Sequence, residues 1–280
     1  MTRLFREALS TMSYRVIRWT GSERSSSVRI LMYHRVTDAH PADRLCVPVQ
    51  SFAKQMRWLR EAGFETVSVA RAVEWIQGDG ALPPKPLVIT FDDGFEDNVL
   101  YGTPALAREG FTACFFVPSG FIESGQPAHP PADRPMTWDQ LRALLDGGHE
   151  IGAHSVTHRR LTSLNAEELA WEVRHCKAVL EQRLGVPVRF FCYPAGHYDP
   201  AVTRVVQAAG YQGACTVKPG SNRQDQDRFA LTRTEISAFD SLWDVEKKLA
   251  GAYDWMHAAI QSAHRWLPGR RRHPSNAMTV

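Results

Sequence analysis

Short apolar segments with strand character alternate with helical patterns along most of this chain. Strands are expected at residues 30–34, 65–68, 86–91, 112–117, 149–153, 188–193, 211–216 and 230–236, and the clearest helices at residues 51–60, 165–184 and 200–209. Such an alternation is typical of parallel βαβ units. It predicts one α/β domain built as a barrel, for which 280 residues are sufficient.

The segment at residues 86–91 is followed directly by two carboxylates, Asp92 and Asp93, and then by Gly94. An apolar, β-branched run of this length is typical of a strand buried on both faces. Successive side chains at a strand end point in different directions, so one carboxylate can bind a metal ion while the other faces a water molecule. The same three residues also suit a simple turn.

Two histidines, His154 and His158, follow the strand expected at residues 149–153. A spacing of four residues lets both imidazoles converge on one ion if the segment makes a helical turn, although a solvated loop can carry the same pattern. Two imidazoles and one carboxylate leave a coordination position open for water, as in hydrolytic zinc sites and, with a different geometry, in non-haem iron sites. Together with the paired aspartates, the histidines indicate a hydrolase.

These motifs resemble those of the polysaccharide deacetylases, the NodB-homology domain of carbohydrate esterase family 4. Residues 90–93 (TFDD) and 154–158 (HSVTH) resemble the first two motifs, and residues 190–196 (FFCYPAG) resemble the third. Residues 31–36 (LMYHRV) are similar to the opening strand of the branch that includes bacterial poly-N-acetylglucosamine deacetylases. The resemblance extends over about residues 28–236 and implies a distorted, incomplete (β/α) barrel.

The resemblance also implies roles for individual residues. Asp93, His154 and His158 would hold one divalent metal ion, which is usually zinc in this family. Asp92 would be the general base that activates the metal-bound water. The same donors also suit cobalt, nickel or iron.

The third motif implies a contribution of Tyr193, Pro194 and Ala195 to substrate binding, with the backbone amide of Ala195 helping to hold the oxyanion. One departure from the family pattern falls here, because Cys192 stands where many members carry an arginine that orients the catalytic aspartate. Arg233, on a late strand, can supply that pairing from another direction, since a guanidinium fork matches a carboxylate. A surface arginine is the alternative.

The sequence does not identify the residue that protonates the leaving amine, because the family's usual Leu-His pair near the C-terminus is not visible. His34 follows a strand on the same face as Asp92, where it suits either catalysis or packing inside the barrel. His257 and His264 lie in helical patterns near the C-terminus, and His197 follows the third motif. These last three also suit ordinary surface positions.

Cysteine usage and the N-terminal pattern bear on the compartment. The five cysteines are scattered through apolar segments, which indicates free buried thiols and favours a reducing compartment. Arginines interrupt the apolar residues at 1–20, so no signal-peptide core or membrane span is expected. We therefore expect a cytoplasmic protein, with the stripe at residues 1–20 packed on the barrel or lying on a membrane surface.

Three regions are expected along the chain. An amphipathic or basic extension covers residues 1–27, the barrel covers residues 28–250, and a helix with a basic tail covers residues 251–280. The net charge is only +3, so no global field indicates a nucleic-acid partner.

The motifs predict a metal-dependent hydrolase that removes N-acetyl groups from a polymeric or lipid-linked sugar, with peripheral membrane contact left open. Two alternatives remain. A glycan-binding protein without turnover would explain the missing histidine motif, but it would not need the full set of site residues. An O-acetyl esterase would also explain it, because an ester leaving group needs less protonation than an amine.

Overall fold

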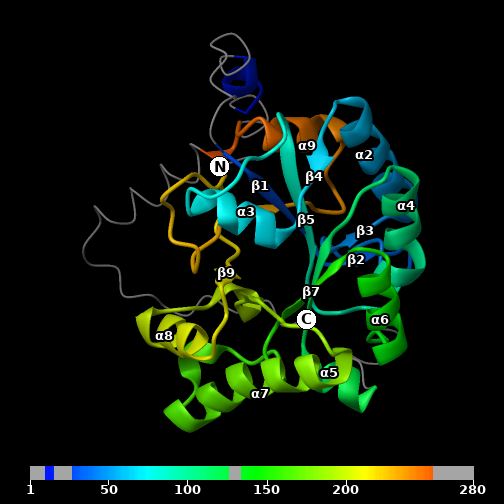
Figure 1. Ribbon diagram of the computed structural model, residues 1–280. Coiled ribbons are helices and arrows are strands. Elements are labelled where there is room, and N and C mark those ends of the chain that lie inside the picture. The colour runs from blue at the N-terminus through cyan, green and yellow to red at the C-terminus, as the bar shows by residue number, and fades with distance from the viewer. Residues whose placement is uncertain (1–9, 16–26, 126–133, 255–280) are drawn as a thin grey trace, which may run out of the picture.

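The computed structural model describes residues 10–15, 27–125 and 134–254 (Figure 1). Its main sheet has eight strands, and every pair is parallel: β1 (Arg29–Tyr33), β4 (Glu65–Thr66), β5 (Pro86–Phe91), β6 (Cys114–Val117), β7 (Glu150–Ala153), β8 (Phe190–Cys192), β9 (Gly213–Cys215) and β10 (Thr234–Glu235). Seven strands follow the order β10-β1-β5-β6-β7-β8-β9, and β4 pairs with the start of β5. A separate pair consists of β2 (Arg35–Val36) and β3 (Cys46–Val47).

The two edges of the main sheet are joined by the segment that ends in β10. Leu231 forms a parallel bridge with Cys215 on β9, whereas Thr234 pairs with Leu31 on β1. The strand expected at residues 230–236 is therefore reduced to β10, because the chain changes partner from β9 to β1 within it. This irregular seam makes the barrel a distorted one, as expected, and it places Arg233 between the two attachments.

Helices connect the strands, and most of them cover the outer face of the sheet (Figure 1). They are α2 (Val49–Glu61), α3 (Val69–Ile76), the π-helix η1 (Asn98–Gly102), α4 (Thr103–Arg108), α5 (Ser119–Ser124), α6 (Trp138–Asp146), η2 (Leu161–Ser163), α7 (Ala166–Leu184), η3 (Pro194–Gly196), α8 (Pro200–Ala208) and α9 (Leu242–Leu249). The longest, α7, is preceded by the N-cap residue Asn165, whose side chain accepts hydrogen bonds from two backbone N–H groups of the first turn. It ends at Gly185 in the left-handed conformation that favours glycine.

Alternate residues of β5 belong to two separate cores. Phe91 packs in the larger core between the sheet and the outer helices, whereas Val88 packs with α3 in a smaller core inside the barrel. With a period of two, Thr90 and Asp92 continue the row of Val88. Asp92 is therefore directed into the barrel at the C-terminal end of its strand.

The described part of the N-terminal segment, residues 10–15, is a helical turn against α9. Tyr14 is buried, its ring meets that of Trp243 edge-to-face with 4.7 Å between centroids, and its hydroxyl donates to Glu246. The helix expected after residue 251, with His257 and His264, lies outside the described residues. In the part of the chain that is described, no helix combines the length and apolar character needed to cross a membrane.

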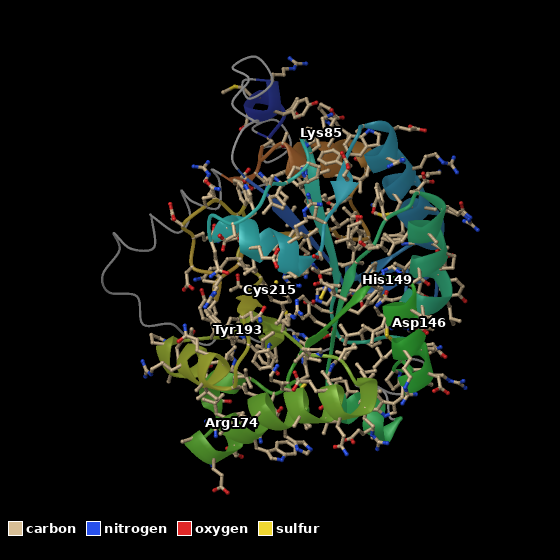
Figure 2. The ribbon with its side chains drawn as sticks, in the orientation of Figure 1. Lys85, Asp146, His149, Arg174, Tyr193 and Cys215 are labelled. Carbon is tan, nitrogen blue, oxygen red and sulfur yellow. The ribbon has the colours of Figure 1, made fainter. Side chains whose placement is uncertain are left out.

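All five cysteines are buried and unpaired, which confirms the prediction of free thiols. Figure 2 shows Cys215 and Tyr193 among the packed elements, whereas Arg174 lies on the outer side of α7. The described structure thus has no disulfide framework, and its stability comes from packing and hydrogen bonds.

Candidate active site

The C-terminal ends of neighbouring strands bring the predicted site residues to one edge of the sheet. Tyr33 pairs in register with Phe91, and the N–H of Asp92 donates to the Tyr33 carbonyl at 3.0 Å. His34 and Asp92 therefore follow adjacent strands at the same level. His154 follows β7, and its N–H donates to the last residue of β6 at 3.0 Å. This edge is where α/β barrels carry their active sites.

Asp93, His154 and His158 converge on one point. Oδ1 of Asp93 lies 3.3 Å from Nε2 of His154 and 3.2 Å from Nε2 of His158. Two ligand atoms that are each about 2.0–2.1 Å from a tetrahedral zinc ion stand about 3.3 Å apart. Oδ1 of Asp93 is also buried without a hydrogen-bond partner among the described residues. The three residues therefore fit as ligands of one divalent metal ion with a further coordination position open.

Left-handed backbone conformations bring these ligands together. Four of the five described non-glycine residues with positive φ are at the site: Asp93 (70°), Ser155 (63°), His158 (57°) and Ala195 (49°). Such conformations cost about 1–3 kcal/mol each and cluster at functional sites. The hydroxyl of Ser155 accepts from the N–H of His158 at 3.0 Å. The two histidines thus converge through a tight, irregular loop rather than through the helical turn that their spacing suggests.

Glu172, on α7, holds the loop between the two histidines. Its carboxylate accepts hydrogen bonds from the N–H groups of Val156 at 2.8 Å and Thr157 at 2.9 Å, and from the hydroxyl of Thr157. The side chain is buried. No motif points to Glu172. Its position on the apolar face of α7, beside Val173 and Cys176, is the feature of the sequence that indicates a buried carboxylate with hydrogen-bond partners.

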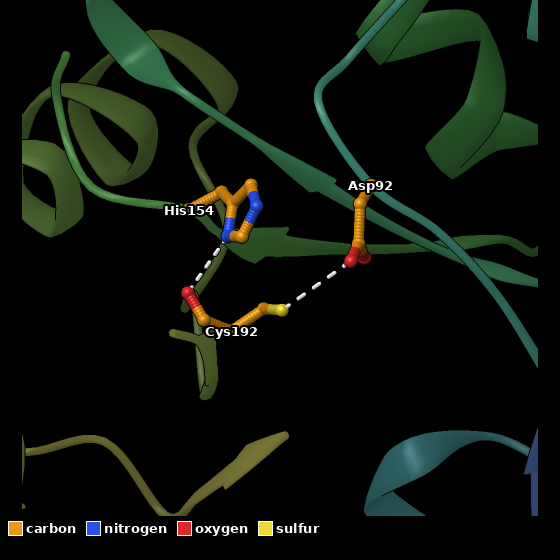
Figure 3. A group of neighbouring side chains, drawn as sticks. All are labelled: Asp92, His154 and Cys192. Atoms are coloured by element: carbon orange, nitrogen blue, oxygen red, sulfur yellow. Dashed lines mark hydrogen bonds between the residues drawn. The ribbon is translucent and has the colours of Figure 1, made fainter. Parts of the chain in front are cut away.

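The tautomer of His154 is fixed by its surroundings. Its Nδ1 lies 2.7 Å from the carbonyl oxygen of Cys192 (Figure 3), which can only accept, so Nδ1 carries a proton. Nε2 is then the atom that faces Asp93. A backbone carbonyl behind a metal-ligating histidine is a common way of orienting the ring.

Charge is distributed unevenly over Asp93, His154 and His158. Burial and the neighbouring His154 lower the pKa of His158 to about 4. Burial opposes the charged form of His154, but its hydrogen bonds with Asp93 and Cys192 and the charge of Asp92 raise its pKa on balance. Burial raises the pKa of Asp93, yet the adjacent imidazoles lower it on balance. Near neutral pH His158 is therefore neutral, whereas the surroundings of His154 favour its charged form.

Asp92 is buried and forms a bidentate ion pair with Arg233. Oδ1 lies 2.7 Å from Nη1, and Oδ2 lies 2.7 Å from Nη2. Arg233 also donates from Nε to the Thr216 carbonyl at 2.8 Å and from Nη1 to the Thr90 hydroxyl at 3.1 Å. Burial raises the pKa of Asp92, but the charge and hydrogen bonds of Arg233 lower it on balance. The carboxylate is therefore ionised and able to accept a proton.

A second group of possible ligands consists of Asp92, His154 and Cys192, whose donor atoms lie within 4.8 Å of one another (Figure 3). Sγ of Cys192 is 3.0 Å from Nη2 of Arg233. A cation there would compete with a guanidinium that already pairs with the same carboxylate. The group around Asp93 is therefore the better metal site.

His34 lies beside both aspartates. It interacts electrostatically with Asp92, Asp93 and His158, and its backbone carbonyl accepts from the side-chain amide of Asn98 at 2.8 Å. Its Nδ1 is buried and has no hydrogen-bond partner among the described residues. A buried nitrogen without a hydrogen-bond partner, at a strand end next to two carboxylates, is consistent with a His34 side chain that contacts a bound ligand.

The third motif presents its backbone rather than its aromatic side chain. Tyr193 is fully buried, and its hydroxyl donates to the Phe229 carbonyl at 3.1 Å. Pro194 is buried too, whereas Ala195 is exposed on the turn. Substrate contact through the Tyr193 ring is therefore ruled out in this conformation. His197 lies at the surface, where its Nε2 is 2.7 Å from Nη2 of Arg160.

Comparison with known proteins shows what this chain is similar to. Residues 79–214 match the profile of the family described as polysaccharide deacetylase. The chain is 28% identical over 219 residues to the polysaccharide deacetylase-like protein YxkH of Bacillus subtilis, a match that covers 78% of this chain and 75% of YxkH. It is 29% identical over 128 residues to the poly-β-1,6-N-acetyl-D-glucosamine N-deacetylase of Escherichia coli, covering 41% of this chain but only 18% of that enzyme.

Solved structures share the fold. The deacetylase PplD of Streptococcus pyogenes, in complex with acetate, superposes with a TM-score of 0.73 at 20% identity, covering 80% of this chain and 99% of PplD. IcaB of Ammonifex degensii gives a TM-score of 0.71 at 24% identity, with coverages of 81% and 98%. The distorted barrel is thus that of the NodB-type deacetylases. Residues 79–214 of this chain thus match the polysaccharide deacetylase family, and the described barrel shares the fold of the solved deacetylases.

Proposed function

We propose that this protein is a metal-dependent N-deacetylase that removes acetyl groups from an N-acetylated sugar. The observation that carries the proposal is the position of an ionised, buried carboxylate, Asp92, directly beside three convergent ligand atoms on Asp93, His154 and His158. A binding protein without turnover has no need of such a base, because Asp92 would only add the cost of burying a charge.

The metal ligands in this proposal are Asp93, His154 and His158. A divalent cation held there, with zinc as the first candidate, would supply a Lewis acid that polarises the acetyl carbonyl and lowers the pKa of a water molecule. The donor set suits several first-row metals, so the cation that occupies the site follows availability as well as affinity.

Asp92 is proposed as the general base. Its carboxylate accepts the proton of the attacking water, while Arg233 keeps it ionised and fixed in direction through two hydrogen bonds of 2.7 Å. Fixing the base in this way avoids reorganisation during the reaction. General base catalysis of this type contributes about 10²- to 10⁴-fold to the rate.

His34 is proposed as the proton donor to the leaving amine. It lies at the end of the strand next to Asp92 and has a buried nitrogen without a partner among the described residues. The backbone amide of Ala195, an exposed residue of the turn, is proposed to stabilise the developing oxyanion, and loss of one such donor costs about 2.7–4 kcal/mol. Tyr193 and Pro194 shape the turn that carries this amide.

The proposed substrate is a sugar with N-acetylglucosamine character, either polymeric or lipid-linked. The Escherichia coli relative is named for poly-β-1,6-N-acetyl-D-glucosamine, and a relative in Bacillus cereus, 27% identical over 128 residues, is named for N-acetylglucosamine in peptidoglycan. Both names share the N-acetylglucosamine unit, which supports it as the first substrate to test.

Acetate release from N-acetylglucosamine oligomers and from an O-acetylated glycan tests the proposal. Wild type loaded with zinc should release acetate from the N-acetylated oligomers, and His154→Ala should release none above background. Release from the O-acetylated glycan alone would replace the deacetylase by an esterase. Absence of release from both, with metal bound, would favour a glycan-binding protein without turnover.

A further inference from the structure

Three neighbouring loops at the C-terminal edge of the sheet carry basic side chains. Arg160 lies in the loop after β7, two residues beyond the proposed ligand His158, and Lys218 lies in the loop after β9. Between them, the loop after β8 carries Ala195 and, two residues later, His197. Strands β7, β8 and β9 are successive neighbours in the sheet, so their loops adjoin. Arg160 and Lys218 therefore flank the turn of Ala195 on both sides.

A hydrogen bond between Arg160 and His197 joins the first two loops. Nη2 of Arg160 lies 2.7 Å from Nε2 of His197. A guanidinium can only donate, so Nε2 accepts and the imidazole is neutral. Burial and the charge of Arg160 both lower the pKa of His197, which favours that neutral form. The pair thus carries one positive charge, on Arg160, at the boundary between the loop of His158 and the turn of Ala195.

Lys218 is held against an aromatic ring from the second loop. Its Nζ lies 2.5 Å from the hydroxyl oxygen of Tyr198 and 4.6 Å from the centroid of that ring. The Tyr198 ring stacks in turn on the buried ring of Tyr193, with 4.6 Å between centroids. The two loops also touch directly, because a Cβ atom on Gly196 would lie 2.2 Å from Cγ2 of Val217. The ammonium group therefore has a fixed support and adds a second positive charge beside the turn.

Neither cation has a carboxylate partner among the described residues. Arg160 and Lys218 are exposed, and their hydrogen bonds there go to a neutral imidazole and a phenol. The adjacent Arg159 differs, because its Nη1 pairs with Glu168 at 3.1 Å. Two cations that neutral groups hold in place keep their charge available to a ligand, and a positive field of this kind attracts and orients anions.

We propose that Arg160 and Lys218 form a subsite for a negatively charged group, a phosphate or a carboxylate, on the N-acetylated sugar. Arg160 donates to His197 through Nη2 and has further N–H groups that match the oxygens of either anion, while Lys218 supplies a point charge. Both residues adjoin the loops of His158 and Ala195, so the charged group belongs to the acetylated sugar or to the sugar next to it. This inference rests on the proposed function and names its substrate class as anionic N-acetylated sugars.

Binding of three small sugars to zinc-loaded Asp92→Asn tests the subsite without turnover. The probes are N-acetylglucosamine, which is neutral, N-acetylglucosamine 1-phosphate, and N-acetylmuramic acid, which carries a carboxylate. Competition calorimetry should show at least one charged sugar bound about tenfold or more tightly than the neutral sugar, and the tighter of the two identifies the group. Equal affinities for all three sugars would overturn the proposal.

Variants in the same background separate the subsite from direct attraction of the anion to zinc. Arg160→Ala and Lys218→Ala should each reduce the preference for the charged sugar about 3- to 10-fold, and high salt should reduce it in the parent protein. Arg159→Ala is the matched control, because it removes a neighbouring exposed cation that pairs with Glu168, and it should leave the preference unchanged. A preference that survives both alanine variants would overturn the subsite.

Turnover distinguishes failure of the subsite from failure of the proposed function. If wild type releases no acetate from any of the sugars or their oligomers, the deacetylase proposal fails, while the binding comparison still decides whether Arg160 and Lys218 hold an anion. If wild type releases acetate with the same kcat/KM from neutral and charged sugars, the subsite fails and the deacetylase proposal remains. A higher kcat/KM for the charged sugar, lowered by Arg160→Ala, supports both.

Discussion

Glu172 and Thr157 are joined at two points across a separation of 15 residues. The Glu172 carboxylate accepts from both the backbone N–H of Thr157, at 2.9 Å, and its hydroxyl. Helix α7 thereby holds the loop on which both proposed histidine ligands lie. The Glu172 side chain is buried, so its end of the contact is shielded from competition by water.

Replacing Glu172 by alanine should weaken metal binding. The change leaves the buried N–H of Val156 and the part-buried N–H of Thr157 without their acceptor, at a cost of about 1–3 kcal/mol in the free energy of unfolding. Disorder of the loop should lower the affinity for zinc about 10- to 100-fold, as loss of an outer partner of a metal ligand does. Denaturation and competition with a chelator measure the two effects. Glu167→Ala, exposed on the same helix, should change neither.

Zinc should stabilise the wild type but not Asp93→Asn. A ligand at 100 times its dissociation constant adds about 2.7 kcal/mol to the free energy of unfolding, or about 5–10 °C in melting temperature for a domain of this size. The asparagine keeps the volume of Asp93 but lacks its negative charge, so the shift should fall below about 2 °C. An equal shift in wild type and variant would show that the cation binds elsewhere. Asp146→Asn, exposed at the end of α6, is the control.

Metal binding near neutral pH should release about one proton. The raised pKa of His154 means that the metal-free cluster holds a proton that must leave before Nε2 can bind a cation. His158, with a pKa of about 4, is already neutral at pH 7. Affinity should therefore rise with pH, about tenfold per unit, until the raised pKa of His154 is passed. Calorimetry in buffers of different ionisation enthalpy counts the protons, and a value of zero at pH 7 would contradict this assignment.

The buried pair of Arg35 and Asp97 should matter far more for stability than an exposed pair. Nη2 of Arg35 lies 2.7 Å from Asp97, and both side chains are about one tenth exposed. Asp97→Ala should lower the free energy of unfolding by about 3–5 kcal/mol, because it removes one partner of a buried ion pair. Asp139→Ala breaks the exposed pair with Arg142 and should cost less than about 1 kcal/mol. Urea denaturation compares the two, and similar losses would refute the distinction.

The barrel and the juxtaposition of the two motifs could be predicted from the sequence for one physical reason. Parallel strands place their C-terminal ends at one edge, so carboxylates and imidazoles that follow different strands meet there. Asp92, Asp93 and His154 come together in this way. The same logic predicts Arg233 on a strand beside Asp92; in the structure Arg233 directly precedes the short strand β10 and still pairs with Asp92.

The remaining features depend on tertiary contacts that no local pattern encodes. His158 approaches Asp93 because Ser155 and His158 adopt left-handed conformations, which the residue types do not predict. Glu172 acts on a loop that precedes it in the chain, and only the fold brings the two together. The side chain of Tyr193 is buried in the core, so its ring packs there although the motif suggests substrate contact.

The most direct measurement compares acetate release with metal content in the same samples. Wild type, stripped of metal and then reloaded with one equivalent of zinc, should release acetate from N-acetylglucosamine oligomers, and the stripped protein should not. Asp92→Asn should bind the same equivalent of zinc and yet lose at least about 100-fold in rate, because it keeps the ligands and lacks the base. Equal rates for stripped and reloaded wild type, or a wild-type rate in the loaded variant, would contradict the account.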